Sequence, residues 1–258
     1  MAACAVHEVG GHPLRVVVRP GEGVPLLMCS GLGGRLELLA PLARGLHGIE
    51  TIRFDVPGVG ESPAPQHPYS LPMLATLTGC LLDRLGYEQV DVFGFSWGGA
   101  LAQQLALQAP NRCRRLVLAA TMPGSVMLPG EPGALLELAT PRRFNDPDHS
   151  RRVAGDLYGG RARTEPVAVD GPGHASHVGY WLQLAAIAGW NSHPWLPSLR
   201  QPTLILAGDD DPIIPLANAR WMACLIPDAR LHVLRDGHYF VRTSVDETAR
   251  VIREFLAS

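Results

Sequence analysis

A serine, an aspartate and a histidine, met in this order along the chain, are the residues best suited to joint chemistry. Ser96 lies in the stretch GFSWGG, between an apolar run at 89–95 and a helical stretch at 100–108. A GxSxG pattern that closes a strand and opens a helix is typical of a nucleophile elbow. In such a sharp turn the flanking glycines remove steric clashes and the hydroxyl projects clear of the sheet. We therefore predict that Ser96 is a nucleophile.

The partners expected for this serine follow two later apolar runs, PTLILA and RLHVL. The first run is followed by Asp209, Asp210 and Asp211, and the second by Asp236-Gly237-His238. His238 would accept the serine proton, and a carboxylate would fix the imidazole tautomer and stabilise its cation. We predict that Asp211 is this carboxylate, because the loop needs a few residues to swing a side chain towards the histidine. Asp209 and Asp210 are expected to be solvated loop acids.

Attack on a carbonyl group creates an oxyanion, which needs two hydrogen-bond donors. One is expected to be the backbone N–H of Trp97, directly after the nucleophile. The other should come from the Gly-rich turn after the run PLLMC, where Leu32 is the best-placed residue. The same turn is not a nucleotide-binding loop, because the third glycine of GxGxxG is missing and the chain contains no lysine.

Composition excludes several classes of protein. The 258 residues are 47% hydrophobic and 18% charged, which is typical of a globular chain. A net charge of −2 offers no basic field for a phosphate backbone, so no nucleic-acid partner is expected. All 22 basic residues are arginine, which excludes a Schiff-base lysine or a Ser–Lys dyad within this chain. No metal and no organic cofactor are expected, because the chain itself supplies nucleophile, base and oxyanion donors.

The cellular compartment is predicted from the cysteines and from the apolar runs. The five cysteines are scattered and form no CxxC pair, as expected of free thiols in a reducing compartment. The first residues show no signal-peptide pattern, and no apolar run reaches the ~18 residues of a membrane span. We therefore expect a cytoplasmic protein without a membrane span.

The alternation of apolar runs with helical stretches predicts an α/β fold, a mostly parallel sheet with helices on both faces. The stretch between about 121 and 199 breaks this rhythm and has no good strand. A loop of that length is unusual in a compact domain. We therefore predict a helical lid insertion at 122–196 and a core formed by 1–121 and 197–258.

Aromatic side chains gather in this insertion and are candidates to bind a substrate. Tyr180, Trp181 and Trp190 would line an apolar cleft above Ser96, in addition to packing the lid. Further candidates for the wall of the cleft are Leu135, Leu136, Leu138, Leu184 and Trp195.

These motifs resemble those of the alpha/beta-hydrolase superfamily, and more closely those of intracellular depolymerases of medium-chain-length poly(3-hydroxyalkanoate). The likeness extends from about 26 to 256. It rests on the stretches LLMCSGLGGRLELLAPL, IETIRFDVPGVGESPAP, GFSWGGALAQQ, RLVLAATMPG, TPRRF, LYGG, QPTLILAGDDDPIIPL and DGHYF. The resemblance implies an alpha/beta-hydrolase fold with a lid. It also implies an ester hydrolase of medium-chain 3-hydroxyalkanoate polyester or oligomers, with Ser96 as nucleophile, Asp211 as acid partner and His238 as base. A polymer granule surface is the further partner that it suggests.

Other functions remain open at this point. The same three residues would serve a general small-molecule esterase, a lactonase or a thioesterase, and carbon–carbon bond hydrolases use the same set. A binding protein that keeps the fold and senses a ligand is a different class. Turnover of a generic chromogenic ester would separate that class from the enzymes. The sequence does not indicate the oligomeric state.

Overall fold

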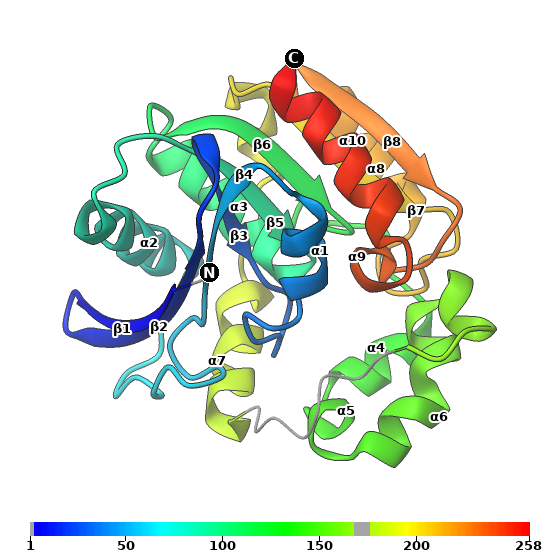
Figure 1. Ribbon diagram of the computed structural model, residues 1–258. Coiled ribbons are helices and arrows are strands. Elements are labelled where there is room, and N and C mark those ends of the chain that lie inside the picture. The colour runs from blue at the N-terminus through cyan, green and yellow to red at the C-terminus, as the bar shows by residue number, and fades with distance from the viewer. Residues whose placement is uncertain (1–2, 168–175) are drawn as a thin grey trace.

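An eight-stranded sheet forms the centre of the computed structural model, which describes residues 3–167 and 176–258 (Figure 1). The strand order is β1-β2-β4-β3-β5-β6-β7-β8. From β4 to β8 neighbouring strands run parallel, whereas β2 pairs antiparallel with both β1 and β4. The strands are β1 (Ala3–Val9), β2 (His12–Arg19), β3 (Glu22–Cys29), β4 (Ile49–Phe54), β5 (Val90–Phe95), β6 (Cys113–Ala119), β7 (Thr203–Gly208) and β8 (Ala229–Leu234).

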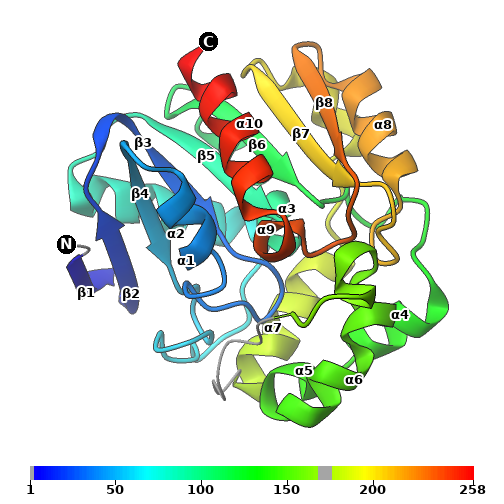
Figure 2. The ribbon, with the colours of Figure 1, turned by 45° about the vertical axis from the view of Figure 1, so that its right-hand side comes forward.

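Helices cover both faces of this sheet, as the alternating pattern of the sequence predicted. Figures 1 and 2 show α1 (Ala40–Gly45) and α10 (Val245–Ala257) together on one face. The helices α2 (Leu71–Leu85), α3 (Trp97–Gln108) and α8 (Leu216–Leu225) pack in the apolar core of the other face. Every residue of β5 and of β7 is buried, which explains why their sequences are almost continuously apolar.

The described part of the chain between β6 and β7, called the helical insertion below, is helical and contains no β-strand. A single isolated bridge joins Gly124 and Asn191 there. Its elements are α4 (Pro132–Leu138), α5 (Arg142–Asn145), α6 (Pro147–Tyr158), α7 (His177–Ala188) and the 3₁₀ turns η1 (Gly160–Arg163) and η2 (His193–Ser198). Figures 1 and 2 show α4–α7 gathered on the side towards which the arrowheads of β5, β6 and β7 point. This is the edge where loops after parallel strands meet.

The last part of the chain returns to the core through short elements. The loop after β8 leads into α9 (Phe240–Thr243), which lies next to α10. Across the described ranges of the chain, we find no helix with the length and apolar character that crossing a bilayer requires.

Candidate active site

Ser96 occupies the tight turn between β5 and α3. Its φ of 53° and ψ of −119° are unusual for a residue with a side chain. Hydrogen bonds hold this conformation: the Ser96 N–H donates to the Ala119 carbonyl over 2.8 Å, and its carbonyl accepts from Thr121 Oγ1 over 2.7 Å. A Cβ on Gly94 or Gly98 would fall within 2.4 Å of a backbone oxygen. The turn is therefore the sharp elbow that the sequence predicted.

His238 and Asp211 continue a chain of hydrogen bonds that begins at Ser96. His238 Nε2 lies 3.0 Å from Ser96 Oγ, and its Nδ1 lies 2.8 Å from Asp211 Oδ2. The other carboxylate oxygen of Asp211 accepts the N–H groups of Ile213 and Ile214, each over 2.8 Å. Both Asp211 and His238 are buried. The fixed carboxylate favours the tautomer in which Nδ1 donates to it, which leaves Nε2 free to accept the proton of the serine hydroxyl.

The two neighbouring acids have other partners. Asp210 is exposed and pairs with the Arg163 guanidinium, whose Nε lies 2.8 Å from its carboxylate. The hydrogen bond from Arg163 lowers the pKa of Asp210 below its ordinary value. Asp209 is exposed and accepts the N–H of Asp236 over 3.1 Å. Asp211 is thus the acid that contacts His238, as predicted, and Asp210 links the core to the insertion instead of being merely solvated.

Asp236 stabilises the loop that carries His238, a role that the sequence did not predict. Only 1% of it is exposed, and its carboxylate accepts the hydroxyls of Thr243 and Ser244 over 2.7 and 2.5 Å. It also accepts the N–H of Arg161, in the insertion, over 3.0 Å. These bonds fix the loop that carries His238. The dipeptide Asp-Gly is equally typical of an ordinary turn. No sequence signal therefore separates a turn residue from a buried acid that fixes a loop.

The loop after β3 lies against the elbow. A Cβ on Gly98 would fall 2.4 Å from the Ser30 carbonyl oxygen, and one on Gly31 would lie 3.4 Å from the Ser96 Cβ. Leu32 and Trp97 both line the cavity that opens at Ser96. The structure therefore places the two residues predicted to supply oxyanion donors beside the serine.

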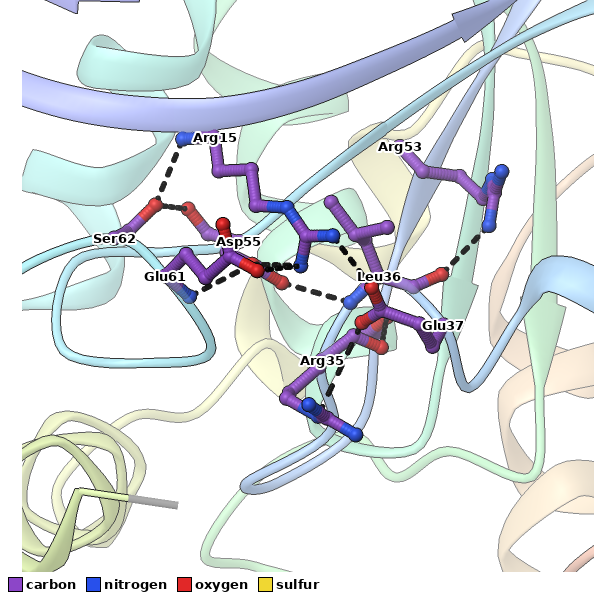
Figure 3. Close-up of polar contacts among 9 residues, drawn as sticks. Arg15, Arg35, Leu36, Glu37, Arg53, Asp55, Glu61 and Ser62 are labelled. Carbon is purple, nitrogen blue, oxygen red and sulfur yellow. Dashed lines mark hydrogen bonds and ion pairs between the residues drawn. The ribbon is translucent and has the colours of Figure 1, made fainter. Parts of the chain in front are cut away.

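A cluster of charged side chains, in which Arg53 and Asp55 are buried, fastens the base of this loop to the core (Figure 3). The Asp55 carboxylate accepts the N–H of Leu36 over 2.7 Å, and Arg53 Nη1 donates to the Leu36 carbonyl over 2.8 Å. Arg15 lies between two acids, with Nη2 2.7 Å from Glu37 and Nη1 3.5 Å from Asp55. Both backbone groups of Leu36 are thus held by side chains from the end of β4 and from the residue that follows it.

An apolar cavity of about 290 Å³ opens at Ser96 and His238. Core and insertion both contribute to its wall. The apolar side chains that line it include Leu38, Phe95, Met122, Met127, Leu135, Leu138, Phe144, Leu184, Ile187, Ile213, Ile214 and Tyr239. Arg143, from the insertion, is the charged side chain that borders this wall. The arrangement can bind an acyl chain and present its carbonyl group to Ser96.

The aromatic residues predicted to bind substrate, Tyr180, Trp181 and Trp190, lie outside this cavity, so the prediction is wrong. The wall of the cavity, as far as the structure describes it, does not include Tyr180, Trp181 or Trp190. The Tyr180 hydroxyl donates to the Leu138 carbonyl over 2.7 Å, and the Trp190 indole donates to Gln104 over 2.8 Å. Trp181 is 52% exposed. A buried phenol or indole needs a polar partner, so Tyr180 and Trp190 are used in packing.

Three leucines named with these aromatics do reach the cavity. Leu135, Leu138 and Leu184 line it. Leu136, on the same helix as the first two, points away and is 73% exposed.

Comparisons with known proteins match this chain to a family model, to curated relatives and to solved structures. A family model described as alpha/beta hydrolase fold matches residues 24–164. The chain is 49% identical to a poly(3-hydroxyalkanoate) depolymerase of Ectopseudomonas oleovorans, over 96% of this chain and 90% of that protein. It is 31% identical to a 2-hydroxymuconate semialdehyde hydrolase of Pseudomonas putida, over 92% and 88%. Among solved structures, a hydrolase from Pseudomonas aeruginosa PA01 aligns with a TM-score of 0.80 at 27% identity, over 99% of this chain and 98% of that one.

The buried carboxyl group of Asp55 generates a prediction about pH. Burial raises the pKa of Asp55 to about 6, against 3.8 for an ordinary aspartate. The folded protein therefore takes up a proton, as pH falls from 7 to 5, that the unfolded chain does not. This uptake stabilises the folded state on acidification, and the gain disappears as pH rises through 6. Relative to Asp55→Asn, the wild type should gain about 1 kcal/mol in free energy of unfolding between pH 7 and pH 5.

Urea unfolding of both proteins at pH 7, 6 and 5 measures this difference. Every other titrating group is common to the two proteins and cancels. A difference that stays constant, or that shrinks on acidification, would show that the Asp55 carboxyl group is not held in the environment described.

Proposed function

Because this chain belongs to the alpha/beta hydrolase family, we propose that it is a serine hydrolase of carboxylic esters that cleaves medium-chain 3-hydroxyalkanoate polyester or its oligomers. The observation that carries the proposal is the hydrogen-bonded chain Ser96–His238–Asp211 at the mouth of an apolar cavity. The identity of 49% with a poly(3-hydroxyalkanoate) depolymerase supports the class of substrate.

In the proposed first step, Ser96 Oγ attacks the ester carbonyl carbon while its proton passes to His238 Nε2. The Asp211 carboxylate stabilises the imidazolium that forms. The carbonyl oxygen becomes an oxyanion and accepts hydrogen bonds from the N–H groups of Leu32 and Trp97. The N-terminus of α3 adds its partial positive charge at the same place. Collapse of this intermediate breaks the ester C–O bond, and His238 returns the proton to the leaving alkoxide.

In the second step, water attacks the acyl-enzyme. His238 takes a proton from the water, and the hydroxide oxygen adds to the acyl carbon. The second tetrahedral intermediate then collapses, the proton returns to Ser96 Oγ, and a carboxylic acid leaves. With a polyester, the alkoxide released in the first step is the 3-hydroxyl group of the neighbouring unit. Each cycle therefore produces one hydroxyl end and one carboxyl end.

The apolar cavity explains the expected preference for medium acyl chains. Each methylene group moved from water into such a cavity contributes about 0.8 kcal/mol. In this account the insertion at 122–196 serves as a lid, because it supplies Leu135, Leu138 and Leu184 to the cavity wall. A cytoplasmic location, with the polymer surface as the site of action, belongs to the same proposal. The buried free thiols of Cys29 and Cys113 are compatible with a reducing compartment.

A general small-molecule esterase, lactonase or thioesterase with the same three residues is the second candidate. The size of the cavity, about 290 Å³, favours it, because this volume suits one acyl unit better than a length of polymer. The two candidates differ in their expected rates on long acyl chains and on polyester.

The aspartate assignment gives the next prediction. Asp211→Asn keeps the shape of the side chain but favours the wrong tautomer of His238, so kcat on a chromogenic ester should fall by about 10³- to 10⁴-fold. Asp209→Asn and Asp210→Asn are the matched controls, from the same loop, and should stay within a few-fold of the wild type. Equal and mild effects at all three positions would remove Asp211 from the mechanism.

The acyl-length profile tests the proposed substrate class. We expect kcat/KM for 4-nitrophenyl esters to rise from acetate to acyl chains of roughly six to twelve carbons, because added methylenes enter the cavity. A medium-chain polyester emulsion assayed in parallel should release 3-hydroxy acids. A profile that peaks at acetate would contradict the polyester assignment and favour the small-ester candidate.

Two variants complete this experiment. Ser96→Ala should lose at least ~10³-fold in turnover on every ester while it keeps the fold. Trp181→Ala removes an exposed aromatic side chain outside the cavity, and should leave the acyl-length profile unchanged. A folded Ser96→Ala protein that retains a tenth of the wild-type turnover would exclude Ser96 as the nucleophile.

A further inference from the structure

The peptide bond between Leu32 and Gly33 is held from both sides by the helical insertion. Arg143 Nη2 donates to the Leu32 carbonyl over 3.3 Å. The Gly33 N–H donates to Gln183 Oε1 over 2.7 Å, although the two residues are 150 positions apart. The proposed oxyanion donor, the N–H of Leu32, belongs to the preceding peptide bond, which is joined to this one at the Leu32 Cα. Side chains from α5 and α7 therefore fix the peptide bond next to the donor.

Gln183 also contacts the segment that carries the second donor. Its backbone carbonyl accepts the indole N–H of Trp97 over 2.9 Å. Only 1% of Gln183 is exposed, and it is absent from the described wall of the substrate cavity. One residue of α7 thus joins the loop after β3 to the nucleophile elbow.

Close packing shows that the insertion is seated directly on this loop. Gly33 has a φ of 69°, and a Cβ there would fall 2.5 Å from Phe144 and 2.9 Å from Tyr180. Arg143 is buried, and its guanidinium carbon lies 4.4 Å from the centroid of the Phe144 ring. Its Nη1 donates to the Tyr180 hydroxyl over 2.7 Å. These contacts hold the guanidinium group in the position from which it donates to the Leu32 carbonyl.

The base and the tip of the loop are therefore fastened by different parts of the molecule. Asp55 and Arg53, from the core, hold the backbone of Leu36 at the base. Arg143 and Gln183, from the insertion, hold the Leu32–Gly33 peptide bond at the tip. If the insertion moved away from the core, the base would stay in place and the tip would lose these two bonds.

We propose that Gln183 and Arg143 are positioning residues that set the oxyanion hole, so that the hole is complete only when the insertion is closed on the core. The proposal rests on the serine-hydrolase function proposed above. Oxyanion donors are effective because they are oriented before the reaction and need no reorganisation during it. A loop tip without its partners would have to be ordered in each cycle, at a cost in conformational entropy. The substrate cavity and the oxyanion hole would then form together when the insertion closes.

Gln183→Met tests this proposal, because methionine fills a similar space and cannot accept a hydrogen bond through an amide oxygen. Gln104→Met is the matched control. Gln104 is also a largely buried glutamine, and it accepts one hydrogen bond from an indole, that of Trp190. Both substitutions remove one buried acceptor, but only Gln183 contacts the loop of Leu32.

Three readouts separate a positioning role from a general loss of structure. The first is kcat and KM on a medium-chain 4-nitrophenyl ester. The second is the Ki of a medium-chain trifluoromethyl ketone, which adds to the Ser96 hydroxyl and places an oxyanion in the hole. The third is the Ki of 1-octanol, which occupies the cavity without forming an oxyanion. Melting temperatures establish that each variant is folded.

We expect Gln183→Met to lose about 10- to 100-fold in kcat, somewhat less than the loss of a donor itself. Its Ki for the trifluoromethyl ketone should rise by a similar factor, while KM and the Ki of 1-octanol stay within about twofold. Gln104→Met should change none of these values. Arg143→Met and Gln183→Met should combine less than additively, because both act on one peptide bond.

Two results would overturn the proposal: a kcat of Gln183→Met equal to that of Gln104→Met, or a loss of kcat without weaker binding of the ketone. If Gln183→Met does not fold, Gln183→Asn keeps the amide but withdraws its oxygen from the Gly33 N–H by one methylene group, and should show the same pattern with smaller factors. Equal binding of the ketone by Gln183→Asn and the wild type would then contradict the proposal. A wild type that neither cleaves esters nor binds the ketone would instead contradict the serine-hydrolase function.

Discussion

The backbone of Ser96 is held at a positive φ between a fully buried strand and a helix, and the geometry of the site depends on this constraint. The strain persists because hydrogen bonds to Ala119 and Thr121 hold the turn, and backbone oxygens lie close to Gly94 and Gly98. The strand β5 lies between β3 and β6 in the sheet. The loop after β3 can therefore approach one side of the serine, and the loops after β7 and β8 bring Asp211 and His238 to it.

The helical insertion contributes both apolar wall residues and polar contacts to this site. Its leucines complete an apolar cavity, and its polar residues contact the loops that carry Leu32, Asp211 and His238. Arg161 donates to Asp236, in the loop of His238, and Arg163 pairs with Asp210, beside Asp211. Arg143 and Gln183 hold the loop of Leu32. Movement of the insertion would therefore break contacts with the loops that carry Leu32, Asp211 and His238.

The sequence predicted the parallel strands and the three residues at the site because both leave a local pattern, an apolar run and a turn motif. The exposed edge strand β1 (Ala3–Val9) leaves no such run, and it was not predicted. The contacts of Gln183 with Gly33 join residues 150 positions apart, and no local pattern reports them. The prediction that Tyr180 and Trp190 line the substrate cavity is wrong. Their sequence did not reveal this, because such aromatic side chains suit packing and a cavity wall equally well. Only their hydrogen-bond partners decide between these uses.

The central claim is that His238 and Asp211 activate Ser96 as the nucleophile at the mouth of an apolar cavity. An octyl fluorophosphonate tests it most directly, because it reacts with an activated serine and carries an apolar chain into the cavity. Mass spectrometry of the digested protein should find one phosphonyl group per chain, on the peptide that contains Ser96. A label on another residue, or an unlabelled chain that still hydrolyses esters after treatment, would contradict the account.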